Sequence, residues 1–125
     1  MTDPDQYAAA LGLTITEHAG GEKGRYYGGG RISLRNNLGS VNRRCTLAHE
    51  IAHHVLGHDP AATGWWKNRQ EREADEWAAN YLISPAEYAA AEFLHGPEPG
   101  AIAAELNTTR HLVEVWRATT TRRSA

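Results

Sequence analysis

Two histidines with a glutamate between them form the pentad His49-Glu50-Ile51-Ala52-His53. Residues four apart on an α-helix share one face, about 40° apart in projection. At this spacing two imidazoles can bind one metal ion, and the glutamate can act as the base toward a water molecule on that ion. Zinc lowers the pKa of such a water from about 15.7 to about 7. The pentad therefore predicts a metal-dependent hydrolytic site with Glu50 as its base.

The segment around the pentad has helical character. Residues 43–56 contain no Gly or Pro. Apolar residues recur at helical spacing, namely Leu47, Ala48, Ile51, Ala52, Val55 and Leu56. Gly57 and Pro60 favour an end to the helix, and Ser40 offers an N-cap hydroxyl. We expect one packed helix that carries both histidines; the alternative is a helix whose histidines are only polar surface residues.

A catalytic zinc site needs a third protein ligand and one open position. His58 and Asp59 come first in the sequence. One zinc-protease pattern places a glycine three residues and a ligand six residues after the second histidine. Leu56 and Asp59 occupy those positions, so the glycine is missing. His58 stands five residues after His53 and leaves its helical face. We interpret both His58 and Asp59 as solvated loop residues.

A stronger candidate for the third ligand lies in residues 70–85, which predict a second helix ended by Ser84-Pro85. Five residues share one face of this helix: Glu71, Ala74, Asp75, Ala78 and Leu82. The two carboxylates on this small, apolar stripe suit a metal site. Glu71 would be the ligand, and Asp75 would accept a hydrogen bond from the free ring nitrogen of a liganding histidine. The alternative is an acidic helix face paired with the basic residues of segment 67–72.

Together these segments resemble the ImmA/IrrE family of metallopeptidases. In that family an H-E-L-G-H-type helix precedes a helix of the pattern E-x-E-A-N/D-x-F-A-x-x-L-L-x-P. The resemblance spans residues 13 to 85 and implies metal ligands at His49, His53 and Glu71 and a general base at Glu50. Asp75 falls at the Asn/Asp position and Pro85 at the final proline. The chain departs from the pattern at packing positions only, namely Ala52, Trp77 and Ile83-Ser84.

The resemblance implies a zinc-dependent endopeptidase that holds one Zn²⁺ with a gluzincin-like third ligand. Many members of the family lie in phages or mobile elements beside a helix-turn-helix transcriptional repressor, which they inactivate, typically by cleavage. We therefore expect a protein substrate of this kind. Two alternatives stay open: a non-cleaving, metal-bearing interaction module that acts as an anti-repressor, and a DNA-binding regulator. Tyr26, Tyr27, His95 and His111 are unranked candidates for stabilising the oxyanion of the tetrahedral intermediate.

Composition limits the remaining possibilities. The chain has 125 residues and a formal net charge of −2, which suits one core and gives no basic field for nucleic acid. It contains no run of 18 apolar residues, and its first five residues are polar and acidic. The single cysteine, Cys45, fits a reducing cytoplasm. We interpret Cys45 as a buried small hydrophobe; the alternative is a regulatory thiol that reaches the metal. We expect one cytoplasmic domain of residues 1–125, as a monomer or weak oligomer, without a membrane partner.

The N-terminal part predicts a short helix at residues 7–11 and strands near 13–16, 25–27 and 31–35, with a glycine turn or bulge at 28–30. We expect an α+β, zincin-like fold with a small three-stranded, mainly antiparallel sheet packed on the active-site helix. The third strand alternates polar and apolar residues: Arg31, Ile32, Ser33, Leu34 and Arg35. We expect it to be the edge strand that pairs with an extended substrate.

The sequence beyond Pro85 predicts a helical extension of residues 86–125 after a catalytic core of residues 13–85. A helix at 86–94 ends before Gly96-Pro97, and residues 101–117 resemble a helix–turn–helix unit. Basic residues gather at this end, namely Arg110, His111, Arg117, Arg122 and Arg123. We favour a packing or partner-docking element over DNA reading, and we expect residues 119–125 to form a frayed tail.

Overall fold

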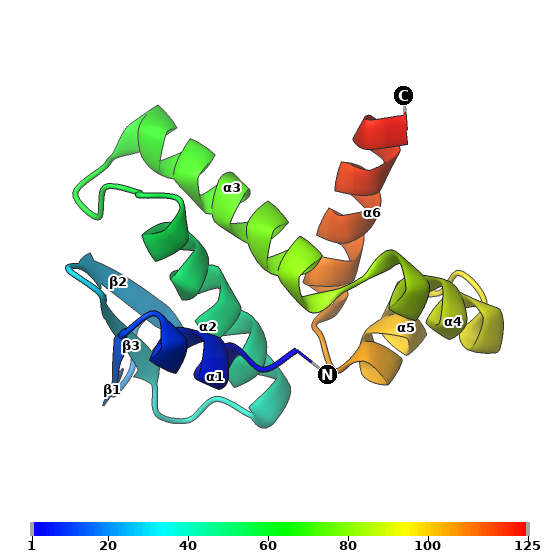
Figure 1. Ribbon diagram of the computed structural model, residues 1–125, viewed down its shortest axis with the longest axis horizontal. Coiled ribbons are helices and arrows are strands. Elements are labelled where there is room, and N and C mark those ends of the chain that lie inside the picture. The colour runs from blue at the N-terminus through cyan, green and yellow to red at the C-terminus, as the bar shows by residue number, and fades with distance from the viewer. Residues whose placement is uncertain (1, 125) are drawn as a thin grey trace.

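The computed structural model describes residues 2–124 and has the expected α+β architecture, with three strands and six helices in the described part. The elements are α1 (Pro4–Ala10), β1 (Thr14–His18), β2 (Gly24–Gly28), β3 (Arg31–Arg35), α2 (Ser40–Val55), α3 (Gly64–Leu82), α4 (Pro85–His95), α5 (Pro99–Leu106) and α6 (Arg110–Ser124). The sheet and the α4–α6 group lie at opposite ends of the molecule, with α2 and α3 between them (Figure 1). No helix over residues 2–124 combines the length and the apolar character that a membrane span needs.

The sheet is mixed, and its strand order is β1-β3-β2. The β2–β3 hairpin is antiparallel, as expected, but β1 and β3 are parallel, with Thr14 opposite Arg31. The prediction that Arg31–Arg35 is an edge strand is wrong, because β3 pairs on both sides. Ser33 explains the misleading alternation: it is 3% exposed, and its buried hydroxyl finds a hydrogen-bond partner in Nδ1 of His18 at 2.7 Å. The backbone of β3 is thus committed to its two neighbours and cannot take a substrate strand.

The edge strand beside the pentad helix is β2. Over residues 2–124 it has a strand partner on one side only. Gly24 makes a close approach to α2 possible, since an added Cβ there would lie 2.7 Å from Thr46 Cγ2 and 2.8 Å from Glu50 Cγ. Near its other end the strand carries a bulge between Tyr26 and Gly28. β2 therefore brings an open, glycine-containing edge next to Glu50.

Helix α2 is buried on two sides. Toward the sheet, Leu47 and Ile51 pack with Ile32 and Leu34 of β3. The helix begins one residue earlier than a Ser40 cap implies, because Gly39 is the N-cap and makes no side-chain capping bond. Helix α3 also begins earlier than the predicted residue 70, at Gly64. Its small residues Ala74, Ala78 and Ala79 are fully buried, which lets α2 and α3 approach closely.

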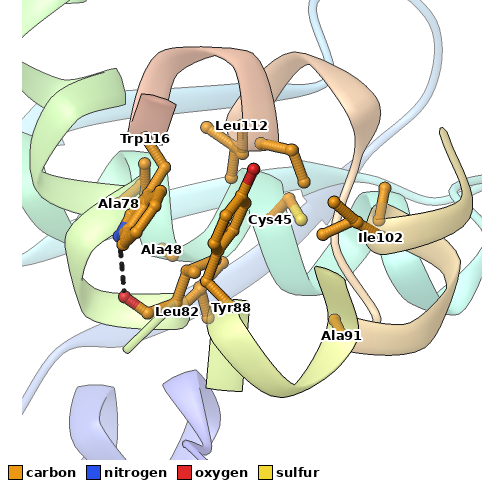
Figure 2. Close-up of a cluster of buried hydrophobic side chains, with 13 residues drawn as sticks. Cys45, Ala48, Ala78, Leu82, Tyr88, Ala91, Ile102, Leu112 and Trp116 are labelled. Atoms are coloured by element: carbon orange, nitrogen blue, oxygen red, sulfur yellow. Dashed lines mark hydrogen bonds between the residues drawn. The ribbon is translucent and has the colours of Figure 1, made fainter. Parts of the chain in front are cut away.

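A second hydrophobic cluster joins α2 and α3 to the C-terminal helices (Figure 2). Its labelled members include Cys45 and Ala48 of α2, Ala78 and Leu82 of α3, and Tyr88, Ile102, Leu112 and Trp116 of α4–α6. The Trp116 ring stacks on Tyr88 at a centroid distance of 4.3 Å, and its Nε1–H donates to the Ile83 carbonyl at 3.1 Å. One core therefore spans the pentad helix and the helices after Pro85.

The prediction of a frayed tail at residues 119–125 is wrong for residues 119–124, and Ala125 lies outside the described residues. Helix α6 continues to Ser124, and Thr119 within it is only 6% exposed. Arg122 donates to Glu76 on α3, and Arg123 donates to Asn80 of the same helix. These bonds hold the last turns of α6 against α3.

The α5–α6 pair packs its apolar residues inward, since Ile102, Leu112, Val113 and Trp116 are buried. Asn107 adopts the left-handed conformation (φ 54°) in the turn, and Arg44 of α2 donates to its carbonyl at 2.8 Å. The five basic side chains of this region all bond to groups of the same chain: Arg110 to Glu114, His111 to Asp75, Arg117 to Tyr88, Arg122 to Glu76 and Arg123 to Asn80. Arg110, His111 and Arg122 are exposed, but their pairing within the chain and the buried apolar face of the two helices favour the packing interpretation.

Candidate metal centre

The helical spacing of the pentad brings three metal-binding side chains together. His49, Glu50 and His53 each offer one ligand atom, and these atoms lie within 4.8 Å of one another. Glu50 and His53 are each 6% exposed. The buried position of Glu50 raises the pKa of its carboxyl, although the two histidines act in the opposite direction. The pentad is thus a packed cluster and not a polar surface.

Helix α3 adds Glu71 to this cluster. Its Oε2 lies 2.9 Å from Nε2 of His49, and its Oε1 lies 3.3 Å from Nε2 of His53. Hydrogen bonds with the two imidazoles lower the pKa of Glu71. One carboxylate therefore faces both ring nitrogens of the pentad. Two imidazole nitrogens and one carboxylate oxygen are a donor set that zinc accepts in catalytic sites, so these residues fit a metal ion.

Asp75 lies one helical turn after Glu71, behind His49. Its Oδ1 is 2.8 Å from Nδ1 of His49, and its Oδ2 is 2.8 Å from Nε2 of His111 on α6. Burial disfavours the charged imidazole of His49, but the bonds to Asp75 and Glu71 outweigh it and raise the pKa of His49 to about 10. Asp75 therefore lies within hydrogen-bonding distance of a histidine of the pentad, as the sequence predicts.

His58 lies behind the other histidine, so the prediction that it is a solvated loop residue is wrong. Its side chain is 7% exposed. Its Nδ1 is 2.9 Å from Nδ1 of His53, and its Nε2 is 3.0 Å from Oε1 of Glu73. Sequence reasoning missed both His58 and Glu73. Asp59, by contrast, is an exposed loop residue whose Oδ1 accepts from the Ala61 amide.

The signal that could have found His58 is Gly57. This glycine has φ 67° and follows the last turn of α2. The His58 amide donates to the His53 carbonyl at 2.9 Å, and the Gly57 amide donates to the His54 carbonyl at 3.2 Å. This pair of bonds is the Schellman motif, which folds the second residue after the helix back over its last turn. A helical projection treats His58 as if the helix continued, so it cannot show that the chain folds back toward His53.

Residues 8–115 match the protein family described as Peptidase_M78, IrrE N-terminal-like domain. The chain belongs to this family. Membership identifies a metallopeptidase, whose substrates are proteins or peptides. The match extends past Pro85 and includes α4, α5 and part of α6. A search of curated proteins found no significant match.

In this Peptidase_M78 chain, Glu50 lines two cavities. The larger, of about 740 Å³, also contains residues 24–27 of β2, His53 and Glu71. The smaller, of about 410 Å³, contains His49, Asp75 and His111 together with Cys45. The pentad glutamate is therefore accessible from both cavities, and Gly24 of β2 lines both as well.

The four candidates for oxyanion stabilisation are not equivalent in this peptidase. Tyr26 and Tyr27 line the larger cavity, and His111 lines the smaller one. Tyr26 also stacks against His53 at a centroid distance of 6.0 Å. His95, on α4, lines neither of these cavities and lies 3.7 Å from Glu105. The geometry keeps Tyr26, Tyr27 and His111 as candidates.

Proposed function

We propose that the chain is a zinc-dependent endopeptidase in which His49, His53 and Glu71 hold one Zn²⁺. The observation that supports this most directly is the Glu71 carboxylate, which lies 2.9 Å and 3.3 Å from the two Nε2 atoms of the pentad. When bound, zinc makes a water molecule acidic and polarises the carbonyl of the scissile peptide bond. Glutamate as third ligand corresponds to the gluzincin arrangement that the sequence predicts.

Glu50 is the general base of this proposal. It takes a proton from the attacking water as the new carbon–oxygen bond forms, and it then delivers this proton to the nitrogen of the leaving amine as the peptide carbon–nitrogen bond breaks. Burial raises the pKa of Glu50, which brings it closer to neutral pH and makes the protonated intermediate form easier to reach. Asp75 keeps the Nδ1 of His49 occupied, so that its Nε2 faces Glu71.

The open edge of β2 is the proposed binding strand for the substrate, in place of Arg31–Arg35. An extended peptide can add to an open sheet edge through main-chain hydrogen bonds. Residues 24–27 line the larger cavity beside Glu50 and His53. Gly24 permits the close approach, because it carries no side chain against Glu50. A peptide paired with β2 would place its backbone next to the base.

The proposed substrate is a helix-turn-helix transcriptional repressor of a phage or mobile element, cleaved in the cytoplasm. Support comes from the resemblance of the two motifs to the ImmA/IrrE family, whose members inactivate such repressors. The basic side chains of α6 are bonded within the chain, which gives direct DNA binding no comparable support.

Glu50→Gln tests this function. The substitution keeps the size of the side chain and leaves the three proposed ligands in place. It should preserve zinc content and lower the rate of cleavage by at least about a hundredfold, since general base catalysis contributes that much or more. Metal analysis measures the zinc content. Gels and mass spectrometry detect cleavage of a repressor that a neighbouring gene encodes. If Glu50→Gln inactivates the repressor as well as the unaltered protein does, the chain is a non-cleaving anti-repressor.

A further inference from the structure

Three side chains behind His53 form a continuous line of hydrogen-bonding groups. Nδ1 of His53 lies 2.9 Å from Nδ1 of His58, and Nε2 of His58 lies 3.0 Å from Oε1 of Glu73. His53 and His58 come from α2 and the turn after it, whereas Glu73 comes from α3. The line therefore connects the pentad helix to the helix that carries Glu71.

The chemistry of these groups fixes the direction of each hydrogen bond. An ionised carboxylate only accepts, so Nε2 of His58 must carry a proton and donate it to Glu73. A neutral imidazole with its proton on Nε2 has a lone pair on Nδ1. Nδ1 of His53 must then be the donor toward His58, because two acceptors would not bond. With a metal ion bound, the lone pair of His53 would thus lie on Nε2, the atom 3.3 Å from Oε1 of Glu71, so that both residues could hold the ion.

We propose that His58 and Glu73 are positioning residues that set the tautomer and ring orientation of His53 for the metal. This inference rests on the proposed zinc site. Metal-binding histidines generally donate their other N–H to a carboxylate, a carbonyl or a water. Here the imidazole of His58 lies between the proposed metal ligand, His53, and the carboxylate of Glu73. His49 is held differently, since Asp75 contacts its Nδ1 directly.

The surroundings hold His58 and Glu73 in place. The Schellman motif at Gly57 fixes the backbone of His58 against the last turn of α2. The other carboxylate oxygen of Glu73 lies 3.4 Å from Nε of Arg69, one turn earlier on α3. Tyr26 stacks on the His53 ring at an interplanar angle of 19°. The His53 imidazole is thus stacked against an aromatic ring and hydrogen-bonded at Nδ1, and these two contacts fix its orientation.

Zinc affinity, measured by competition with a chelator on the full chain, tests the proposal without reference to cleavage. His58→Ala should lower the affinity about ten- to a hundredfold. His58→Asn should retain most of it, because its amide oxygen can take the place of Nδ1 as acceptor. Glu73→Ala should lower the affinity in the unaltered protein, but not in the His58→Asn background, where the link to Glu73 is already lost.

Matched controls separate this effect from general damage. Glu76→Ala removes a carboxylate of the same helix that bonds to Arg122 and, among residues 2–124, to no histidine. His95→Ala removes a histidine on α4, which lies 3.7 Å from Glu105. Both should leave zinc affinity unchanged. Circular dichroism of every variant verifies that it is folded.

Long-range ¹H–¹⁵N correlation of the zinc-loaded, unaltered protein gives a second measurement that needs no variant. His53 should carry its proton on Nδ1 and His58 on Nε2. A proton on Nδ1 of His58, or a folded His58→Ala variant with the zinc affinity of the unaltered protein, would overturn the inference and leave the proposed function intact. If the unaltered protein does not bind zinc at all, both fail together.

Discussion

The two histidines of the pentad occupy the same helix but have unlike environments. Nδ1 of His49 bonds a carboxylate, Asp75, which also bonds His111. Nδ1 of His53 meets the imidazole of His58. A carboxylate in direct contact makes an imidazole a stronger electron donor than a neutral partner does. The two proposed metal ligands should therefore differ in basicity although their side chains are chemically identical.

Cys45 provides a prediction at the scale of a single residue. Burial raises the pKa of its thiol, and the side chain lies in the hydrophobic cluster of Figure 2. A raised pKa means less thiolate at neutral pH, and the thiolate is the reactive form. Alkylation by iodoacetamide at pH 7 should be at least about a hundredfold slower in the folded protein than in guanidinium chloride. Equal rates would indicate an accessible thiol and support the alternative in which Cys45 reaches the metal.

At the scale of elements, helical periodicity proved the most informative feature of the sequence. It placed Glu71 and Asp75 on one face of α3, and the structure brings both to the pentad. Periodicity is local, so it needs no knowledge of distant neighbours. The position of β3 in the sheet could not be predicted in this way, because strand order depends on pairings between distant residues. Ser33 reads as solvent-facing until its partner His18 is known.

Gly24 carries a prediction about β2 and α2. A methyl group at this position would lie 2.7 Å from Thr46 and 2.8 Å from Glu50, too close for either to stay in place. Gly24→Ala should lower kcat/KM for cleavage about ten- to a hundredfold, because a small displacement of Glu50, the proposed base, would have an effect of this size. Gly39→Ala is the matched control, since an added Cβ there meets nothing within 4 Å. Full activity of Gly24→Ala would show that β2 can move away from Glu50 without consequence.

At the scale of the whole molecule, the helices after Pro85 are part of the same structure as the site. They bury Ala48 of α2 and Ala78 of α3 within one cluster, and α6 delivers His111 to Asp75. The motif resemblance ends at Pro85, so nothing in the motifs connects these helices to the chemistry. Their contribution arises from packing between distant segments, which a motif does not encode.

Trp116 is the residue that tests this packing. It is 6% exposed, stacks on Tyr88 and donates to the Ile83 carbonyl. Trp116→Ala should lower the free energy of unfolding by about 3–5 kcal/mol. Trp116→Phe should cost less, since it retains much of the ring contact and loses the hydrogen bond. Denaturant unfolding measures both, with Trp65→Ala as control, because Trp65 is 63% exposed and its removal should cost about 1 kcal/mol or less. Equal losses for Trp116→Ala and Trp65→Ala would contradict a shared core.

The open edge of β2 has one more consequence, which concerns solubility. An unpaired strand edge attracts the edges of other molecules and can seed aggregation. In β2 the bulge between Tyr26 and Gly28 interrupts the regular spacing of the backbone groups, and Arg25 places a charge within the strand. Bulges and charges of this kind disfavour edge-to-edge strand pairing between two copies of the chain. An edge of this kind can thus pair with a short peptide and yet disfavour the growth of an aggregate from β2.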